Sequence, residues 1–381
     1  MCLLIKRSLL LPAVLVIYSC QLTTGKKEVF TSGTEKFVID TLATGLQTPF
    51  GLDFLPDGKI IFTERSVKNE SIRLLDTATF TVTNVGNVPA VFSESDGGML
   101  DIVVHPDYAA NGWIYFAYSQ IKADSTSTLL VERAKLLNNN LTGRQPIFEV
   151  FPYYKSSNHF GCRLLLKSGY LFITMGDRYA ARDSAQSLSN DFGKIIRLHD
   201  DGRIPADNPF VNNRKARPEI WSYGHRNPQG LAFHPVSGEL WEHEHGPQGG
   251  DEINRIKPGH NYGWPIITYG EEYGGGKVGA GIVAKEGMEQ PHYFYRPSIA
   301  PSGMTFYTAD KFPSWKNSLF LGSLAYKHLN HLYLKGDTIA REERLLTKQE
   351  WRIRNVKEGP DGFLYVAVDK GMIVRLRTVG K

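Results

Sequence analysis

One pattern recurs along this chain of 381 residues and limits its fold more than any other feature. Each copy is an apolar segment, a turn containing Pro, Asp or Gly, and a second segment rich in Ile, Phe, Tyr or Val. This order is typical of a β-hairpin with a tight turn. Six copies are present, and they begin at residues 51, 101, 163, 230, 303 and 356.

The spacing of the copies indicates how the hairpins are arranged. Successive copies begin 50, 62, 67, 73 and 53 residues apart. A period of about fifty residues, lengthened by insertions, is typical of propeller blades, each of which is one four-stranded sheet. The sequence therefore predicts an all-β fold, a six-bladed β-propeller over residues 36–377. We expect a strand at residues 36–42 to close the ring against residues 372–376.

The N-terminus has the pattern of an export signal. Lys6 and Arg7 precede an apolar stretch at residues 8–18 that is too short for a stable membrane span, and Cys20 follows it. We predict a lipoprotein-type signal peptide over residues 1–19, a lipidated Cys20 and a tether over residues 20–35. The protein is then exported, either periplasmic or a membrane-tethered lipoprotein that meets the membrane only through its lipid. Simple export and an uncleaved anchor are the alternatives.

Charge and cysteine content narrow the partners and the covalent structure. The formal charge is only +5, and no Lys/Arg cluster marks a nucleic-acid face, so nucleic acid is excluded as a partner. The chain has 3 cysteines. With Cys2 removed and Cys20 acylated, Cys162 is left alone, so no intrachain disulfide is expected.

Several polar residues stand just before a hairpin, where a propeller presents them at the mouth of its central channel. His159 precedes the third copy, and an imidazole there could act as a general base, although a lone histidine is more often structural. Arg226 and Asn227 precede the fourth copy. Arg352 and Arg354 precede the sixth, with both guanidinium groups on one strand face. Arginines aimed at one axis indicate a polyanionic ligand, provided that the ring exists.

An acidic, glycine-rich segment at residues 246–252 could hold a hard cation. Its glycines can turn backbone carbonyls inward, and Glu252 supplies a charged oxygen, as Ca²⁺ prefers. An exposed turn is the alternative. The nearby His243 and His245 lack a spaced third ligand, which argues against zinc.

Several segments resemble the soluble PQQ-dependent aldose sugar dehydrogenases, which form the glucose/sorbosone dehydrogenase family. The resemblance covers roughly residues 36–377. It implies a six-bladed propeller that oxidises the C1 hydroxyl of aldoses to lactones with pyrroloquinoline quinone (PQQ) and Ca²⁺. The electron acceptor is not identified by the sequence. The segments that carry the resemblance are TPFGLDFLPDGKIIFTER, GGMLDIVVHPDY, HFGCRLLL, GKIIRLHDDGRIPADNPF, EIWSYGHRNPQGLAF, EHGPQGGDEIN, GHNYGWP and RIRNVKEGPDGFLYV.

The resemblance also implies roles for residues at matching positions. His159 would be the general base. Arg226 and Asn227 would contact the quinone, and Arg352 and Arg354 would pair with its carboxylates.

Metal ligands follow from the same resemblance. The carbonyls of Gly246 and Pro247 would hold the cofactor Ca²⁺, and Glu252 and Tyr262 would bind a structural Ca²⁺.

The chain departs from the family pattern at four positions. Asp96 replaces a usual Gln and is retained as a candidate cofactor ligand, and Asn158 replaces an acidic residue and is a candidate substrate ligand. Cys162 replaces a Gly. Ala325 stands where the family has a cofactor-binding Lys, and we expect Lys327 to reach the cofactor from the same strand face.

Two other functions stay open at this point. One is a propeller binding module that has lost PQQ turnover, which the loss of the lysine at Ala325 would favour. The other is a calcium-dependent lactonase on the same fold, which would have no need for Arg352 and Arg354.

Overall fold

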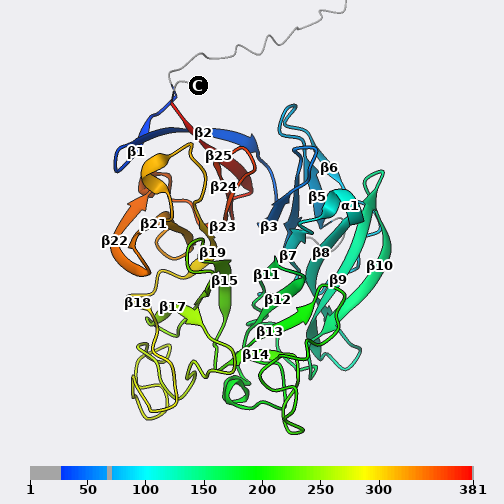
Figure 1. Cartoon of the computed structure of the whole chain (residues 1–381), viewed down its shortest axis with the longest axis vertical. Coiled ribbons are helices and arrows are strands. Elements are labelled where there is room, and N and C mark those ends of the chain that lie inside the picture. Colours follow the sequence, from blue (N-terminus) through cyan, green and yellow to red (C-terminus); the bar gives the residue numbers. More distant parts are fainter. Residues whose placement is uncertain (1–26, 67–70, 380–381) are drawn as a thin grey trace, which may run out of the picture.

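The computed structural model describes residues 27–66 and 71–379, so the predicted signal peptide and Cys20 lie outside the described residues. Those residues form six antiparallel sheets around one axis (Figure 1). The prediction of an all-β, six-bladed propeller is confirmed. Every helix in the described part of the chain is too short or too polar to cross a bilayer.

The first three blades follow the chain in order. Blade 1 contains β3 (Pro49–Phe54), β4 (Ile60–Glu64), β5 (Ile72–Leu75) and β6 (Val82–Asn84). Blade 2 contains β7 (Met99–Val104), β8 (Trp113–Ile121), β9 (Ser127–Leu137) and β10 (Asn140–Glu149). Blade 3 contains β11 (Leu164–Lys167), β12 (Tyr170–Met175), β13 (Lys194–His199) and β14 (Ile220–Tyr223).

The last three blades complete the ring. Blade 4 contains β15 (Pro228–Phe233), β16 (Leu240–Glu244), β17 (Asp251–Ile256) and β18 (Tyr293–Tyr295). Blade 5 contains β19 (Pro301–Phe306), β20 (Leu319–Ser323), β21 (His328–Lys335) and β22 (Thr338–Leu345). Blade 6 contains β23 (Ile353–Glu358), β24 (Leu364–Val368), β25 (Met372–Thr378), β2 (Glu35–Ala43) and β1 (Phe30–Ser32).

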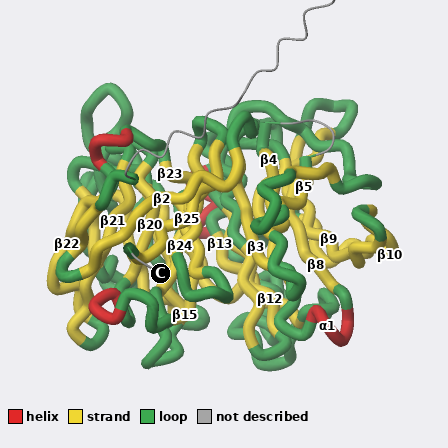
Figure 2. The backbone as a smooth tube through the Cα atoms, turned by 90° about the horizontal axis from the view of Figure 1, so that it is seen from above, coloured by secondary structure: helices red, strands yellow, loops and turns green. Residues whose placement is uncertain are grey.

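Helical structure is confined to short connections between the strands (Figure 2). These are α1 (Tyr108–Asn111) and three 3₁₀ turns, η1 (Arg182–Gln186), η2 (Pro313–Trp315) and η3 (Thr347–Gln349). The first strand of each blade contacts the first strands of its neighbours, so β3, β7, β11, β15, β19 and β23 line the channel. The end of the ring where these strands begin is called the site face below.

The ring closes by pairing the two ends of the described chain. Strand β2 pairs antiparallel with β25, and the two strands lie side by side in blue and red in Figure 1. Asp40 on β2 accepts hydrogen bonds from Arg375 Nη2 at 3.0 Å and Arg377 Nε at 2.9 Å. Lys27 Nζ also lies 2.5 Å from this carboxylate. One buried acid therefore joins the first and last strands of the ring.

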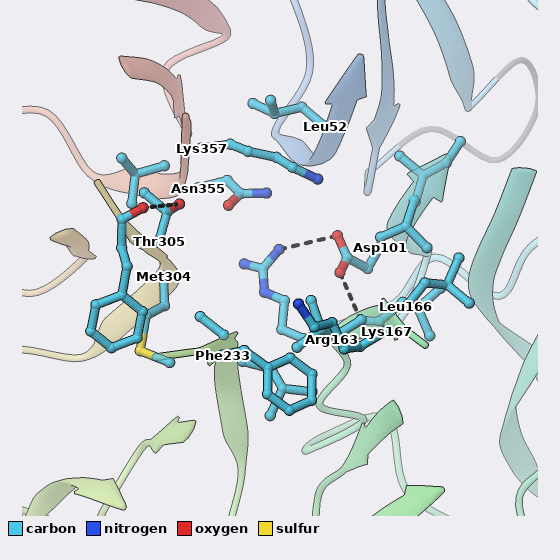
Figure 3. Close-up of a pocket in the computed structure, with 18 of the residues that line it drawn as sticks. Leu52, Asp101, Arg163, Leu166, Lys167, Phe233, Met304, Thr305, Asn355 and Lys357 are labelled. Atoms are coloured by element: carbon cyan, nitrogen blue, oxygen red, sulfur yellow. Dashed lines mark hydrogen bonds and ion pairs between the residues drawn. The ribbon is translucent and has the colours of Figure 1, made fainter. Parts of the chain in front are cut away.

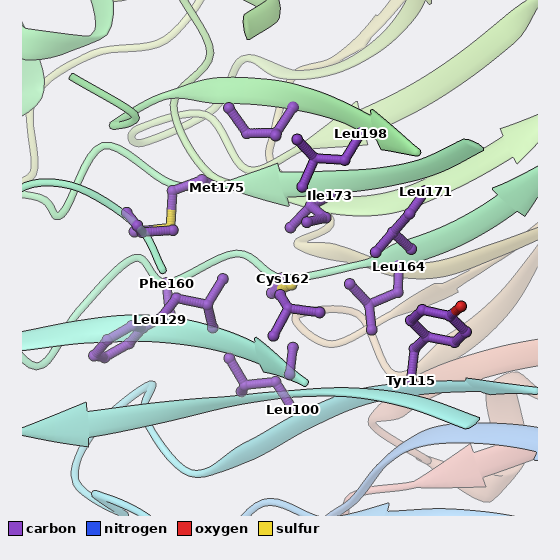
Figure 4. Close-up of a cluster of buried hydrophobic side chains, with 14 of the residues drawn as sticks. Leu100, Tyr115, Leu129, Phe160, Cys162, Leu164, Leu171, Ile173, Met175 and Leu198 are labelled. Atoms are coloured by element: carbon purple, nitrogen blue, oxygen red, sulfur yellow. The ribbon is translucent and has the colours of Figure 1, made fainter. Parts of the chain in front are cut away.

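The core lies between adjacent blades, as in the cluster between blades 2 and 3 (Figure 4). There Leu100 and Leu129 pack against Phe160 and Ile173. Cys162 is fully buried in the same cluster, where burial raises the pKa of its thiol well above the usual range. This departure from the family pattern is therefore a matter of packing rather than of ligand contact.

The side chain of Arg163, which precedes blade 3, crosses the channel and forms hydrogen bonds with each of the other five blades. Its guanidinium contacts Phe50 O of blade 1 at 3.3 Å and Asp101 Oδ1 of blade 2 at 3.4 Å. Its Nε donates to Gln229 O of blade 4 at 2.8 Å. Its Nη2 donates to Ser302 Oγ of blade 5 at 3.4 Å and to Arg354 O of blade 6 at 2.9 Å. Beyond this side chain, away from the site face, a cavity of about 300 Å³ opens (Figure 3).

We predict that Arg163→Met destabilises the propeller by about 3–5 kcal/mol, because it leaves the buried Asp101 carboxylate without its ion-pair partner and removes the side-chain donor to Gln229 O. Urea unfolding measures the change. The control is Arg203→Met, since the side chain of Arg203 is 76% exposed and pairs only with nearby Asp201. A loss below about 1 kcal/mol, the size typical of a surface ion pair, would contradict the role of Arg163.

We also predict a pH-dependent contribution from Asp40. Burial alone would raise its pKa, but hydrogen bonds from Lys27, Arg377 and Arg375 lower it from 3.8 to about 2. Because the folded pKa is below the unfolded one, the stabilisation is complete above about pH 4 and is lost between pH 4 and 2. Asp40→Asn should therefore destabilise the protein by about 1 kcal/mol at pH 7, after allowance for solvent screening.

Chemical denaturation of this variant between pH 7 and pH 3 tests the linkage. The destabilisation should shrink as the pH falls, whereas Asp107→Asn, which replaces an exposed aspartate, should change stability little at any pH. A destabilisation by Asp40→Asn that is constant over this range would refute the proposed ion pairs.

Candidate functional site

His159 lies at the site face, just before β11, and a carboxylate fixes its ring. Its backbone is in the left-handed region, with φ of 50°. Nδ1 donates to Asp177 Oδ1 at 2.6 Å, so Nε2 is the nitrogen that can accept a proton. None of the described residues forms a hydrogen bond with Nε2. The predicted base is thus buried, oriented and available.

Asp177 was not selected from the sequence, although it is the second residue after β12. It is 1% exposed, and Oδ2 accepts a hydrogen bond from Trp264 Nε1 at 2.7 Å. The backbone N–H of Tyr179 donates to Oδ1 at 2.7 Å. These bonds hold the carboxylate in place beside His159, which is the arrangement that orients a histidine base.

Arg226 and Asn227 lie between β14 and β15, next to the histidine. Arg226 Nη1 donates to His245 O at 2.9 Å, while its Nε is buried without a described partner. Asn227 Oδ1 accepts from the backbone of Gly161 at 3.2 Å, and its amide nitrogen donates to no described residue. Each residue therefore has a donor left for a ligand.

A cavity of about 230 Å³ lies next to these groups and is lined by Asp177 and Arg226, but not by His159 or Asn227. Asp177, Arg226 and Trp264 line its inner side. Tyr179 lines it as well and packs its ring edge-on against His159, with centroids 5.2 Å apart. The cavity is large enough for a monosaccharide-sized ligand beside an oriented base.

Arg352 and Arg354 meet at a second carboxylate that sequence reasoning missed. Arg354 binds Asp369 through Nε at 2.9 Å and Nη2 at 2.8 Å, and Arg352 Nε lies 3.3 Å from the same carboxylate. Burial alone would raise the pKa of Asp369, but the bonds and charge of Arg354 and the charges of Arg352 and Arg65 lower it. One of the two cationic charges is therefore balanced, and the other is left for an anionic ligand.

The expected position of Lys327 is wrong. β20 ends at Ser323, and residues 324–327 form a turn in which Lys327 has φ of 55°, so strand alternation does not apply. Ala325 is exposed in this turn. No hydrogen bond or ion pair joins Lys327 to a residue in the described ranges.

Asp96 and Asn158 lie beside the histidine. Asp96 Oδ2 accepts a hydrogen bond from the backbone N–H of His159 at 3.0 Å, and its Oδ1 lies 3.9 Å from Arg65 Nη1. Asn158 Oδ1 accepts a hydrogen bond from Ser95 Oγ at 2.5 Å. Both candidates therefore belong to the site face, where Asp96 helps to position the predicted base.

Three carboxylates are buried together under Arg226 and Asn227. Glu242 lies in the middle of β16 and Glu244 ends that strand, while Glu252 lies opposite Glu244 on β17. Asn254 Nδ2 is shared among them at 3.2, 3.4 and 3.3 Å. Burial and then the charge of Glu244 raise the pKa of Glu242 and of Glu252 well above the usual range.

This acidic cluster has the chemistry of a site for a hard cation. Ligand atoms of His225, Glu242 and Glu244 lie within 4.8 Å of one another. A cavity of about 10 Å³, enough for one water-sized particle, lies between Glu244, Glu252 and their neighbours. Oxygen ligands of this kind suit Ca²⁺.

Three of the four predicted metal ligands surround that small cavity, namely Gly246, Glu252 and Tyr262. Pro247 lines the larger cavity with Arg226 instead. The Tyr262 hydroxyl donates to Arg255 O at 2.6 Å and accepts from a backbone N–H, so only its carbonyl is left for a cation. Glu252 lies on a buried strand rather than in an exposed turn.

Comparison with known proteins identifies similar chains. The sequence profile of the family described as Glucose / Sorbosone dehydrogenase matches residues 46–375. Aldose sugar dehydrogenase YliI of Escherichia coli K12 is 41% identical over 340 residues, which are 87% of this chain and 90% of that protein.

Solved structures agree with this. The soluble aldose sugar dehydrogenase of Escherichia coli in its apo-form superposes with a TM-score of 0.85 at 39% identity, covering 90% of this chain and 99% of the other. The PQQ-bound aldose sugar dehydrogenase of Streptomyces coelicolor gives a TM-score of 0.72 at 27% identity, covering 91% and 99%.

Proposed function

Because the chain belongs to the glucose/sorbosone dehydrogenase family and is an oxidoreductase that acts on sugars, we propose that it oxidises the C1 hydroxyl of aldoses to lactones with PQQ. The carrying observation is His159, whose Nδ1 is fixed by Asp177 while Nε2 has no partner among the described residues. Asp177 and Tyr179, which both contact this ring, line a cavity of about 230 Å³. The PQQ-bound structure of a relative supports the choice of cofactor.

The residues at the site face fit PQQ, a planar tricarboxylate. Arg226 has a buried Nε without a partner among the described residues, and Asn227 has a free amide nitrogen beside it. Arg352 and Arg354 share a single carboxylate, so they retain positive charge for a carboxylate of the ligand. These four residues would hold the cofactor, which when bound supplies the two-electron acceptor for the hydride from C1.

Each side chain has a task in this reaction. His159 Nε2 accepts the proton of the C1 hydroxyl, and Asp177 stabilises the imidazolium that forms. The positive charge of Arg226 stabilises negative charge that develops on its side of the cavity. Trp264 holds the Asp177 carboxylate through Nε1, and Tyr179 packs against the ring of His159.

We propose that Ca²⁺ occupies the acidic cluster and the neighbouring loop. Glu244 and Glu252 would supply charged oxygens, Tyr262 a backbone carbonyl, and the carbonyls of Gly246 and Pro247 would complete the cofactor side. A cation relieves the repulsion among three buried carboxylates that share one amide.

We also propose that the protein works outside the cytoplasm and passes its electrons to an acceptor there. The basis is the signal-like sequence of residues 1–19, which with Cys20 lies outside the described residues. A lipid on Cys20 would tether the propeller through residues 20–35.

The first test of function is substitution of the base. Protein reconstituted with PQQ and Ca²⁺ should reduce a dye when aldoses are added, and His159→Ala should lower kcat by about 10³-fold. Asp177→Asn should lower kcat by about 10- to 100-fold, because the ring loses its orientation. His260→Ala, which removes a half-exposed histidine paired with Glu289, is the matched control. Full activity of the His159 variant would rule out this base.

The second test concerns the cation. Ca²⁺ at about a hundred times its Kd should raise Tm by roughly 5 °C, because it binds only the folded protein. Glu244→Gln should abolish this response and should stabilise the cation-free protein by removing one of the crowded charges. Differential scanning calorimetry with and without chelator measures both effects.

The control for the cation test is Asp310→Asn, because this side chain is 87% exposed and pairs with Lys316 rather than with a residue of the acidic cluster. Its response to Ca²⁺ should equal that of the unmodified protein. An undiminished Ca²⁺ response in Glu244→Gln would place the cation elsewhere.

A further inference from the structure

Arg65 is a third arginine at the site face, and the sequence reasoning did not select it. It directly follows β4, the second strand of blade 1. Its side chain is 18% exposed, and its guanidinium makes one ion pair, a long one of 3.9 Å to Asp96. Of the residues that the structure describes, none accepts a hydrogen bond from this guanidinium.

The charges around Arg65 connect it with the arginines of blade 6. Burial and then the charge of Arg354 lower the pKa of Arg65, while Asp96 and Asp369 act in the opposite direction and Arg352 adds repulsion. Blades 6 and 1 are neighbours in the ring, because β23 contacts β3. The three guanidinium groups therefore share one electrostatic environment.

The carboxylates in this environment are already engaged. Asp369 accepts hydrogen bonds from Arg352 and from both Nε and Nη2 of Arg354. Asp96 Oδ2 accepts a hydrogen bond from the backbone N–H of His159, and its Oδ1 is the oxygen that pairs with Arg65. The three arginines and the two aspartates together carry one net positive charge. The N–H donors of the Arg65 guanidinium have no hydrogen-bond acceptor among the described residues.

A guanidinium that is mostly buried and makes no hydrogen bond is unfavourable unless a ligand completes it. Its planar donors match a carboxylate better than any other common anionic group except phosphate. In blade 5, the turn at residues 324–327 carries an exposed Ala325, and no hydrogen bond or ion pair with a described residue fixes Lys327 there.

We infer that Arg65 binds a carboxylate of PQQ from blade 1, as a third arginine anchor beside Arg352 and Arg354. The inference rests on the proposed function, since it assumes that PQQ is the cofactor. It assigns to blade 1 a cationic anchor, whereas the corresponding turn of blade 5 carries Ala325.

The test is a PQQ titration of the cofactor-free, full-length protein in the presence of Ca²⁺, followed by absorbance and by tryptophan fluorescence. Arg65→Gln should raise the Kd for PQQ by about 10- to 100-fold, and Arg65→Lys should raise it less, because the charge is kept but the fork is lost. The Kd of the Gln variant should also depend less on ionic strength. Arg73→Gln, on the next strand of blade 1 and paired with Glu64, should bind PQQ like the unmodified protein.

A double-mutant cycle with Asp96 separates cofactor binding from a purely local role. If Arg65 only neutralises Asp96, the double variant Arg65→Gln/Asp96→Asn should regain the original Kd, which would overturn the inference. If Arg65 binds PQQ, the double variant should stay weak. Circular dichroism and Tm of each variant show that the fold is kept.

Two further results have separate meanings. An unchanged Kd in Arg65→Gln overturns the inference but leaves the proposed function intact. No binding of PQQ to the unmodified protein overturns the proposed cofactor and this inference with it.

Discussion

The guanidinium of Arg163 is the constraint on which the site depends, because it bonds to all five of the other blades at the channel axis. Five N–H donors in a rigid plane allow one side chain to do this. The position of this guanidinium also determines where the residues of the candidate site lie. His159 lies four residues before it, its acceptor Gln229 lies two residues after Asn227, and another acceptor is the carbonyl of Arg354. A displacement at the axis would therefore move His159, Asn227 and Arg354 together, which are the proposed base and two proposed cofactor contacts.

The fold could be predicted from the sequence because hairpin signals are local. Strand alternation and turn residues can be recognised within a segment of about a dozen residues, and their repetition along the chain indicated six blades. The same regularity located His159, Arg226 and Arg352, since each stands just before the first strand of a blade. The order of blades around an axis then brings them to one face without further information.

The site residues that were not predicted from the sequence share a second position in the repeat, at the end of the second strand. The second strand of each hairpin ends at the face where the first begins, so the residue at that end belongs to the site. Arg65 and Asp369 directly follow such strands, Asp177 is the second residue after one, and Glu244 ends one. Lys327 was misplaced for the opposite reason. Turn geometry after β20 depends on the path of the chain and on a positive φ, which strand alternation cannot supply.

The cation and cofactor regions are coupled through one side chain. Glu244 accepts hydrogen bonds from the backbone N–H groups of both Arg226 and Asn227, and its other oxygen faces the acidic cluster. Without a cation, burial and then the charge of Glu244 raise the pKa of Glu252, so the charged form of Glu252 is disfavoured. A cation in the cluster would therefore stabilise the backbone that carries the quinone contacts. Metal loading and cofactor affinity should then be thermodynamically linked, with each increasing the other by the same factor.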